Sequence, residues 1–166
     1  MLPTSRVQPS KADILLRPLP PEGGDLVTRR VGRPTFGLYA ATAYAARHRE
    51  VLKAADWTRL SFVGLDETRA HFASEGWLRS LPGWPGAWLR CSYALGIYDG
   101  VLAGAGLGVL ATYAAIRVPD LVPVVETIPE LAQDIWLTTH RALADSPRIR
   151  AVSDSIGRIW SGDPAI

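Results

Sequence analysis

The sequence has few of the residues that build cross-links and metal centres. It contains a single cysteine, Cys91, and three histidines in 166 residues. One thiol cannot form an intramolecular disulfide or a cysteine-rich zinc site, and it is typical of a reducing compartment. Residues 1–9 also lack the apolar segment of a signal peptide. We therefore expect a cytoplasmic protein with no metal or other cofactor.

An excess of charge of one sign is also missing. The chain has 18 basic and 16 acidic residues, for a net charge of +2. That balance does not indicate nucleic-acid binding. Basic residues cluster at Arg29, Arg30 and Arg33, which we interpret as a solvated edge beside a turn rather than a phosphate site.

Local catalytic motifs are absent as well. His48, His71 and His140 are far apart in the sequence, with no His-Glu-x-x-His spacing, and there is no Gly-x-Ser-x-Gly elbow. Asp66, Glu67 and His71 could share one face of a predicted helix, but two ligands and a helix cap make a poor zinc site. The sequence therefore predicts a protein that is not an enzyme, although a triad assembled only in the fold stays open.

One long stretch, residues 100–116, carries no charge. It is short for a membrane span, and Gly104, Gly106 and Gly108 would weaken a continuous helix there. Its order is helix, then glycines, then strand, which is the reverse of a Gly-x-Gly-x-x-Gly nucleotide loop. We predict a buried helix, a tight glycine turn and a buried strand, with no membrane contact.

Apolar runs alternate with amphipathic segments along the chain. Short apolar runs predict strands, and helical spacing of apolar residues predicts helices between them. Ser146-Pro147 is typical of a helix start, with serine as the cap and proline as the first helical residue. This alternation predicts an α/β fold with mostly parallel strands. The expected strands cover residues 12–17, 36–40, 60–64, 88–91, 107–113, 121–125 and 135–139.

Three predicted strands are followed by polar residues at helix starts. These residues are Thr42, Asp66 and Ser92, the last followed by Tyr93. Helix starts carry free N–H groups that hold anions, and ligands of α/β sheets gather at the carboxyl ends of strands. We therefore expect a pocket for a small anion. Plain helix capping explains each residue alone and stays open as the alternative.

Several segments, in this order, resemble the effector-binding domain of LysR-type transcription regulators. The most specific pair is DIWLTTH followed by SPRIRAVSD, which is similar to the closing strand and helix of that family. The segments ADILLRP, FGLYA with Ala43-Tyr44, VGLDE with Trp77-Leu78, and VLAGAGLG resemble the family at earlier positions. The order and spacing hold from residue 12 to about residue 160.

The resemblance implies a two-lobe fold like that of type 2 periplasmic binding proteins, with a small effector held in the cleft. It places Thr42, Asp66, Ser92 and Tyr93 on the second lobe's side of that cleft. It also adds Gly106 to the ligand-binding residues. Ala40, Ala41 and Val122 would belong to the two crossing hinge strands.

The resemblance also divides the chain. The family's helix-turn-helix and the first two strand–helix units have no counterpart in the sequence, so we expect an incomplete first lobe and DNA contact only through a helix-turn-helix outside this chain. The expected divisions are a disordered or unrelated start (1–11), a partial first lobe (12–40 and 126–160), a second lobe (41–120), a return hinge strand (121–125) and a tail (161–166).

Three functions are therefore weighed. The first is an effector-sensing domain, which binds a small anionic molecule and assembles with copies of itself. The second is a fragment that acts through assembly with full-length relatives. The third is a small α/β enzyme, against which the lack of catalytic motifs counts.

Overall fold

The computed structural model of the chain describes residues 12–20 and 24–161. It divides the chain into two compact units. Within the described residues, unit 1 comprises 12–20, 24–34 and 133–161, and unit 2 comprises 35–132. The predictions for residues 1–11 and 162–166 lie outside the described residues.

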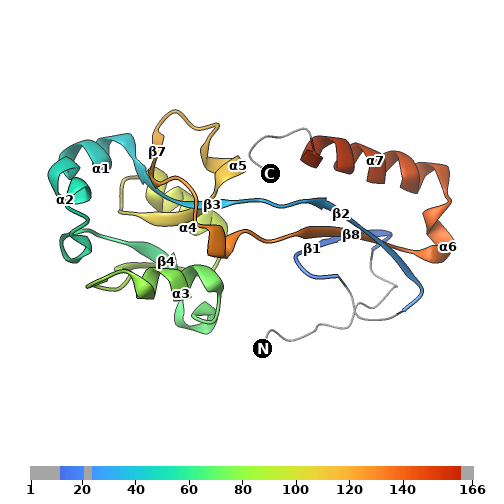
Figure 1. Ribbon diagram of the computed structural model, residues 1–166, viewed down its shortest axis with the longest axis horizontal. Helices are drawn as coiled ribbons and strands as arrows, with labels where there is room; N and C mark the ends of the chain where they lie inside the picture. The colour runs from blue at the N-terminus through green and yellow to red at the C-terminus, as the bar shows by residue number, and fades with distance from the viewer. Residues whose placement is uncertain (1–11, 21–23, 162–166) are drawn as a thin grey trace. The chain divides into compact units, whose positions relative to one another are not determined.

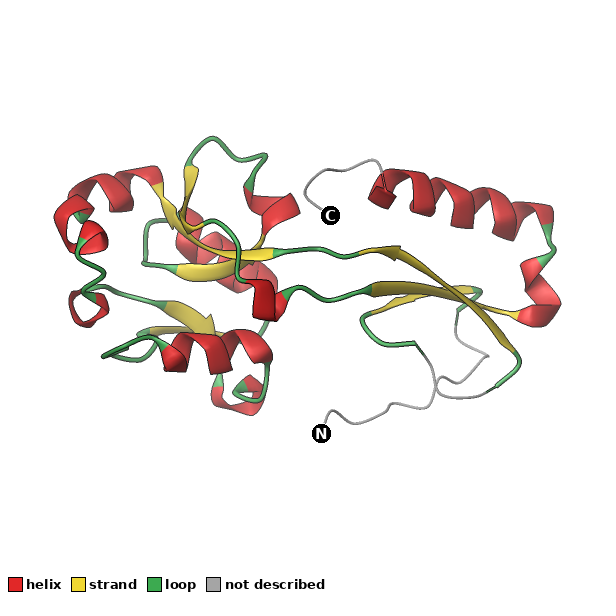
Figure 2. Ribbon diagram, viewed as in Figure 1, coloured by secondary structure: helices red, strands yellow, loops and turns green. Residues whose placement is uncertain are grey.

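Unit 1 is a three-stranded antiparallel sheet with a long helix against it (Figures 1 and 2). Strand β8 lies in the centre, with Leu137 paired to both Leu16 and Arg29 on its two sides. The elements are β1 (Ile14–Arg17), β2 (Leu26–Gly32), β8 (Ile135–His140), α6 (Arg141–Ala144) and α7 (Pro147–Ser161).

Helix α7 begins at Pro147, as Ser146-Pro147 predicted. Ile149 and Ser153, one helical turn apart, are both buried, as is Leu137 of the sheet. The Arg29 guanidinium of β2 donates to the Ser153 carbonyl and forms an ion pair with Asp154 at 3.2 Å. These contacts fix α7 along β2.

Unit 2 contains two sheets, of order β6-β3-β7 and β4-β5, which are linked by a parallel bridge between Phe62 and Leu107. Its strands are β3 (Phe36–Ala41), β4 (Val63–Leu65), β5 (Leu89–Cys91), β6 (Gly108–Ala111) and β7 (Leu121–Val125). Its helices are α1 (Thr42–Arg47), α2 (Arg49–Lys53), η1 (Trp57–Arg59), η2 (Glu67–Arg69), α3 (Ala73–Ser80), α4 (Ala94–Leu102), α5 (Thr112–Ala115) and η3 (Pro129–Leu131).

Side chains of the unit 2 strands alternate between two apolar cores. Leu38 lies in one core with Phe62, whereas their neighbours Tyr39 and Val63 lie in the other. This alternation follows from the two-residue period of a strand. Ile97 and Val101 of α4, one turn apart, fill the second core, so helices cover both faces of the strands.

The prediction of mostly parallel strands is wrong. The pairs β1·β8, β2·β8, β3·β6 and β3·β7 are antiparallel, and parallel pairing occurs in β4·β5 and at the single Phe62–Leu107 bridge. The chain leaves unit 1 through β2 and β3 and returns through β7 and β8. Strands on the outward passage therefore oppose strands on the return passage. In unit 1, β8 lies between β1 and β2, so the neighbour that each of them pairs with is the antiparallel return strand.

The strand predicted over residues 107–113 is shorter than expected. It ends at Ala111, and Thr112–Ala115 forms the short helix α5. A run of alanine and tyrosine after Thr112 has no breaker to stop a helical turn, which the apolar pattern alone did not reveal.

The unit boundaries at 34–35 and 132–133 lie outside the expected lobe boundaries near residues 40 and 120–126. Strands β3 and β7 belong to unit 2 because they pair with each other, through Ala40 with Val122 and Ala41 with Leu121. A hinge at Ala40, Ala41 and Val122 stays a prediction.

Candidate functional site

Two of the predicted binding residues meet where β4 and β5 end. These strands are parallel, with Leu65 beside Cys91, so the next residues, Asp66 and Ser92, emerge together. The Asp66 N–H donates to the Cys91 carbonyl at 3.0 Å. The Ser92 hydroxyl donates to the Asp66 carboxylate. The register of the two strands therefore brings Asp66 and Ser92 together, as expected at the carboxyl edge of parallel strands.

The Asp66 carboxylate is the centre of a small polar network. It accepts from the Thr68 N–H at 3.1 Å and from the Thr68 hydroxyl at 2.6 Å. It also forms an ion pair with Arg69 at 3.4 Å. Side-chain hydrogen bonds from Thr68 and then Ser92 hold the pKa of Asp66 below its ordinary value of 3.8; burial opposes them and the charge of Arg69 adds to them. Asp66 is therefore ionised at neutral pH.

Arg69 joins this network to Tyr93, and the sequence prediction missed it. Its guanidinium lies 4.9 Å from the centre of the ring of Tyr93, a residue that is 70% exposed. The Arg69 side chain itself is 31% exposed, so part of its hydrogen-bonding capacity faces solvent. Its position three residues after Asp66 was the available signal, because such a spacing brings side chains together in a helical turn.

The start of α4 lies in the same place. Ser92 was predicted as the helix cap, but that prediction is wrong: Tyr93 is the N-cap, and its side chain makes no capping hydrogen bond. The Ser92 hydroxyl is committed to Asp66 instead. The first N–H groups of this nine-residue helix thus lack a side-chain cap, which suits them to a hydrogen-bond acceptor from a ligand.

A buried carboxylate holds the backbone next to the cluster. Glu75 of α3 is 3% exposed, and its Oε1 accepts from the Leu65 N–H at 2.9 Å. Leu65 immediately precedes Asp66, so this bond fixes the backbone from which Asp66 projects. Glycine at position 64 makes room for it, since a Cβ there would lie 3.1 Å from the Glu75 carboxylate.

Thr112 follows the next strand in line. It comes directly after β6, and β6 is connected to β4 by the Phe62–Leu107 bridge. Its Oγ1 is buried and has no hydrogen-bond partner among the described residues. Thr112 is thus a further candidate at the same edge, which the strand prediction hid by running through it.

Thr42 and Gly106 are not part of this cluster. Tyr39 pairs with Gly108 at the start of β6, so the end of β3, where Thr42 follows, lies beside the amino ends of β6 and β4. That is the edge opposite Asp66. Thr42 also does not cap: Ala41 is the N-cap of α1, without a side-chain hydrogen bond.

Gly106 has a packing role that the structure makes explicit. Its φ is +156°, and a Cβ on it would overlap the backbone of Ser61. Glycine is therefore required where the chain approaches β4. Ligand binding by Gly106 or Thr42 stays a prediction.

Two general findings concern the described part of the chain. In residues 12–20 and 24–161, no three histidine, cysteine, aspartate or glutamate side chains are grouped to hold a metal ion. Within the same residues, none of the helices has the length and apolar character needed to cross a membrane.

Similar folds occur in solved structures of LysR-type regulators. The regulatory domain of CrgA from Neisseria meningitidis aligns with a TM-score of 0.65 at 18% identity, covering 90% of this chain and 76% of that one. A second structure, of CrgA itself, aligns with the same TM-score of 0.65 at 19% identity, and this chain covers 53% of that one. The regulatory domain of an AphB variant from Vibrio vulnificus aligns with a TM-score of 0.62 at 14% identity, covering 91% and 77%.

These likenesses establish the two-lobe, periplasmic-binding-protein-like α/β fold. Comparison with curated proteins found no match. The family described as the LysR substrate binding domain matches residues 3–160, nearly the whole sequence. The chain therefore belongs to the LysR substrate-binding domain family, the effector-binding domain of LysR-type transcription regulators.

Proposed function

We propose that this domain binds a small anionic effector at the carboxyl ends of β4 and β5. The observation that carries the proposal is the gathering of Asp66, Ser92 and Arg69 at one edge of the unit 2 strands. The family match supplies the expectation of a small ligand, and the polar edge supplies a place for it.

Each residue has a distinct role in this proposal. Arg69 donates to the effector's carboxylate or phosphate, and the uncapped start of α4 supplies backbone N–H groups. Asp66 holds Arg69 in place and accepts from Ser92, so it positions rather than binds an anion. Tyr93 offers an exposed ring to the apolar part of the effector. Thr112 contributes its unpaired hydroxyl.

The domain senses its effector and does not transform it. The polar network contains no nucleophile beside a base, because the Ser92 hydroxyl donates to a carboxylate that Arg69 already neutralises. In the whole regulator, which is cytoplasmic, effector binding changes how a helix-turn-helix outside this sequence holds DNA. Ala40, Ala41 and Val122 form the hinge for that change.

The domain also assembles, either with a second copy or with full-length relatives. Large apolar side chains exposed to solvent support this part of the proposal: Trp88 is 65% exposed, Leu95 69% and Ile159 67%. Light scattering with and without a tagged full-length relative distinguishes a homo-oligomer from a mixed one.

A thermal-shift panel of small carboxylates and phosphates tests the effector proposal. A compound at about 100 times its Kd adds about 2.7 kcal/mol of stability, which a melting midpoint readily detects. Arg69→Gln should abolish that rise, and Arg90→Gln, an exposed arginine on β5, should retain it. Mass spectrometry should recover the compound unchanged. The proposal fails if no compound raises the midpoint, or if Arg69→Gln keeps the full rise.

A further inference from the structure

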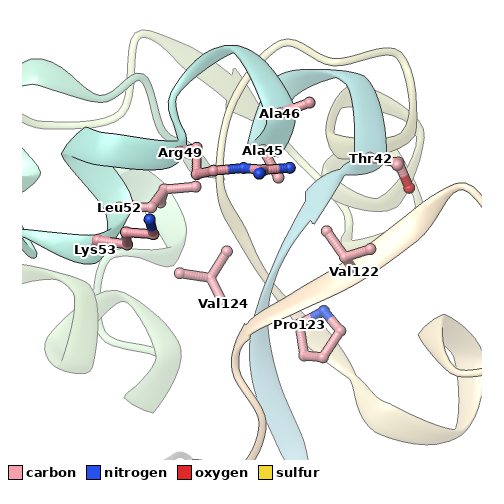
Figure 3. Close-up of a pocket in the computed structure, with 9 residues that line it drawn as sticks. All are labelled: Thr42, Ala45, Ala46, Arg49, Leu52, Lys53, Val122, Pro123 and Val124. Carbon is pink, nitrogen blue, oxygen red and sulfur yellow. The ribbon is translucent and has the colours of Figure 1, made fainter.

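A concave region lies in unit 2, at the edge of the sheet opposite the Asp66 cluster. It is a groove of about 460 Å³ between α1, α2 and the edge strand β7 (Figure 3). That volume is in the usual range for small-molecule sites, about 300–1,000 Å³. The groove residues are Thr42, Ala45, Ala46, Arg49, Leu52, Lys53, Val122, Pro123 and Val124.

The charged residues that line the groove are all basic. Arg49 and Lys53 are its two ionised residues, and no acidic residue lines it. Lys53 forms an ion pair with Glu50 at 3.2 Å, but both side chains are mostly exposed, so this pair holds the ammonium group only weakly. Arg49 has no hydrogen-bond or ion-pair partner among the described residues. A guanidinium left unpaired beside a groove favours a carboxylate, which it can bind through two parallel hydrogen bonds.

The remaining surface of the groove is apolar. Val122, Val124 and Leu52 are half-buried, and Ala45 lies beside them. Figure 3 shows the Arg49 side chain extending from α2 along the groove toward Ala45, with Val122 and Val124 on the facing strand. A ligand with a carboxylate at one end could place that group on Arg49 and its hydrocarbon against the valines, removing apolar surface from water.

We propose that this groove binds a small monocarboxylate with a short apolar body, at a site separate from the effector cluster. The carboxylate contacts Arg49 and Lys53, and the Thr42 hydroxyl is within the same lining. Since Val122 pairs with Ala40 of β3, such a ligand would contact the β3–β7 pair directly. The site thus gives the domain a second small-molecule input that does not depend on Asp66 or Arg69.

Titration of the 15N-labelled full chain with hexanoate tests the proposal by NMR. Saturable shifts are expected for the amides of Leu52, Val122 and Val124. Hexanol, hexylammonium and sulfate are the comparison probes: the first lacks the charge, the second reverses it and the third lacks the hydrocarbon. Each should bind at least about fivefold more weakly, because each loses either the charge-assisted hydrogen bonds or the apolar contact.

Two variants locate the binding determinant. Arg49→Gln should weaken hexanoate binding at least about fivefold, since it removes the charged donor. Ala46→Glu places an acid in the groove and should weaken binding as much. The matched controls are Arg59→Gln and Ala54→Glu, at exposed positions outside the lining, and both should bind as the parent does. Amide spectra of all four variants verify that each is folded.

The possible results separate clearly. The proposal is overturned if hexanoate shifts no groove amide, if Arg49→Gln and Arg59→Gln bind equally, or if hexanol or sulfate binds as tightly as hexanoate. Arg69→Gln, which lies at the opposite edge, should leave hexanoate binding unchanged. Loss of binding in that variant would mean that hexanoate uses the effector cluster and would likewise overturn the second site.

Discussion

Removing the buried carboxylate of Glu75 should destabilise the protein, because the carboxylate holds the backbone beside the effector cluster. In Glu75→Ala, the Leu65 N–H loses its partner at 2.9 Å inside the protein. An unsatisfied buried donor costs about 1–3 kcal/mol. The one buried methylene that is lost, Cγ, adds about 0.8 kcal/mol. The sum is about 2–4 kcal/mol, which for a chain of this size lowers the melting midpoint by about 5–15 °C.

Two matched variants separate the hydrogen bond from the other effects. Glu75→Gln keeps an oxygen that can accept from Leu65 and should cost less than about 1 kcal/mol. Glu67→Ala removes an exposed acid nearby and should change stability by less than about 0.5 kcal/mol. Urea unfolding followed by circular dichroism gives all three values. The reasoning is refuted if Glu75→Ala is as stable as Glu67→Ala, or if Glu75→Gln loses as much as Glu75→Ala.

The other predictions concern backbone strain, pH and thiol reactivity. Gly106→Ala should cost about 3 kcal/mol or more, because a methyl group there overlaps backbone, whereas Gly86→Ala meets no neighbour within 4 Å and should cost about 1 kcal/mol through its positive φ alone; comparable midpoints would contradict this. Because the folded-state pKa of Asp66 is lowered, its ionised form stabilises the fold above pH 3.8, and that contribution disappears as the pH falls through the lowered pKa. The stability gap between the parent and Asp66→Asn should therefore be present at neutral pH and close in acid; a gap that stays constant in acid would be the wrong outcome. Burial, and then the charge of Asp99, raises the pKa of Cys91 above 9.0, so at pH 8 iodoacetamide should alkylate it more slowly than free cysteine and faster in Asp99→Asn. Equal alkylation rates for the parent, Asp99→Asn and free cysteine would contradict a raised pKa of Cys91.

Patterns within single elements could be read from the sequence. The strand at residues 121–125 and the start of α7 at Pro147 were predicted and are confirmed. The order of the motifs also indicated the correct family, because those motifs report local backbone and core positions that a chain must repeat to reach the same fold.

The pairing direction of distant strands, and which site residues it brings together, could not be predicted from the sequence in the same way. Alternating strands and helices predicted parallel pairing, but the single outward and return passage between the units makes most pairs antiparallel. The same reversal separates Thr42 from Asp66, although each follows a strand. Asp66 and Ser92 were predicted together and do meet, since the crossover through η2 and α3 leaves β4 and β5 parallel. Arg69 was missed because its role depends on Tyr93, which is distant in sequence.

The most direct test of the effector site is to map where an effector binds. An anionic compound selected by thermal shift is titrated into the 15N-labelled chain, and the amide shifts are followed by NMR. Saturable shifts centred on Asp66, Arg69, Ser92 and Tyr93, with little change at Val122 and Val124, are the predicted result. Shifts that avoid these four residues would contradict an effector site at the carboxyl ends of β4 and β5.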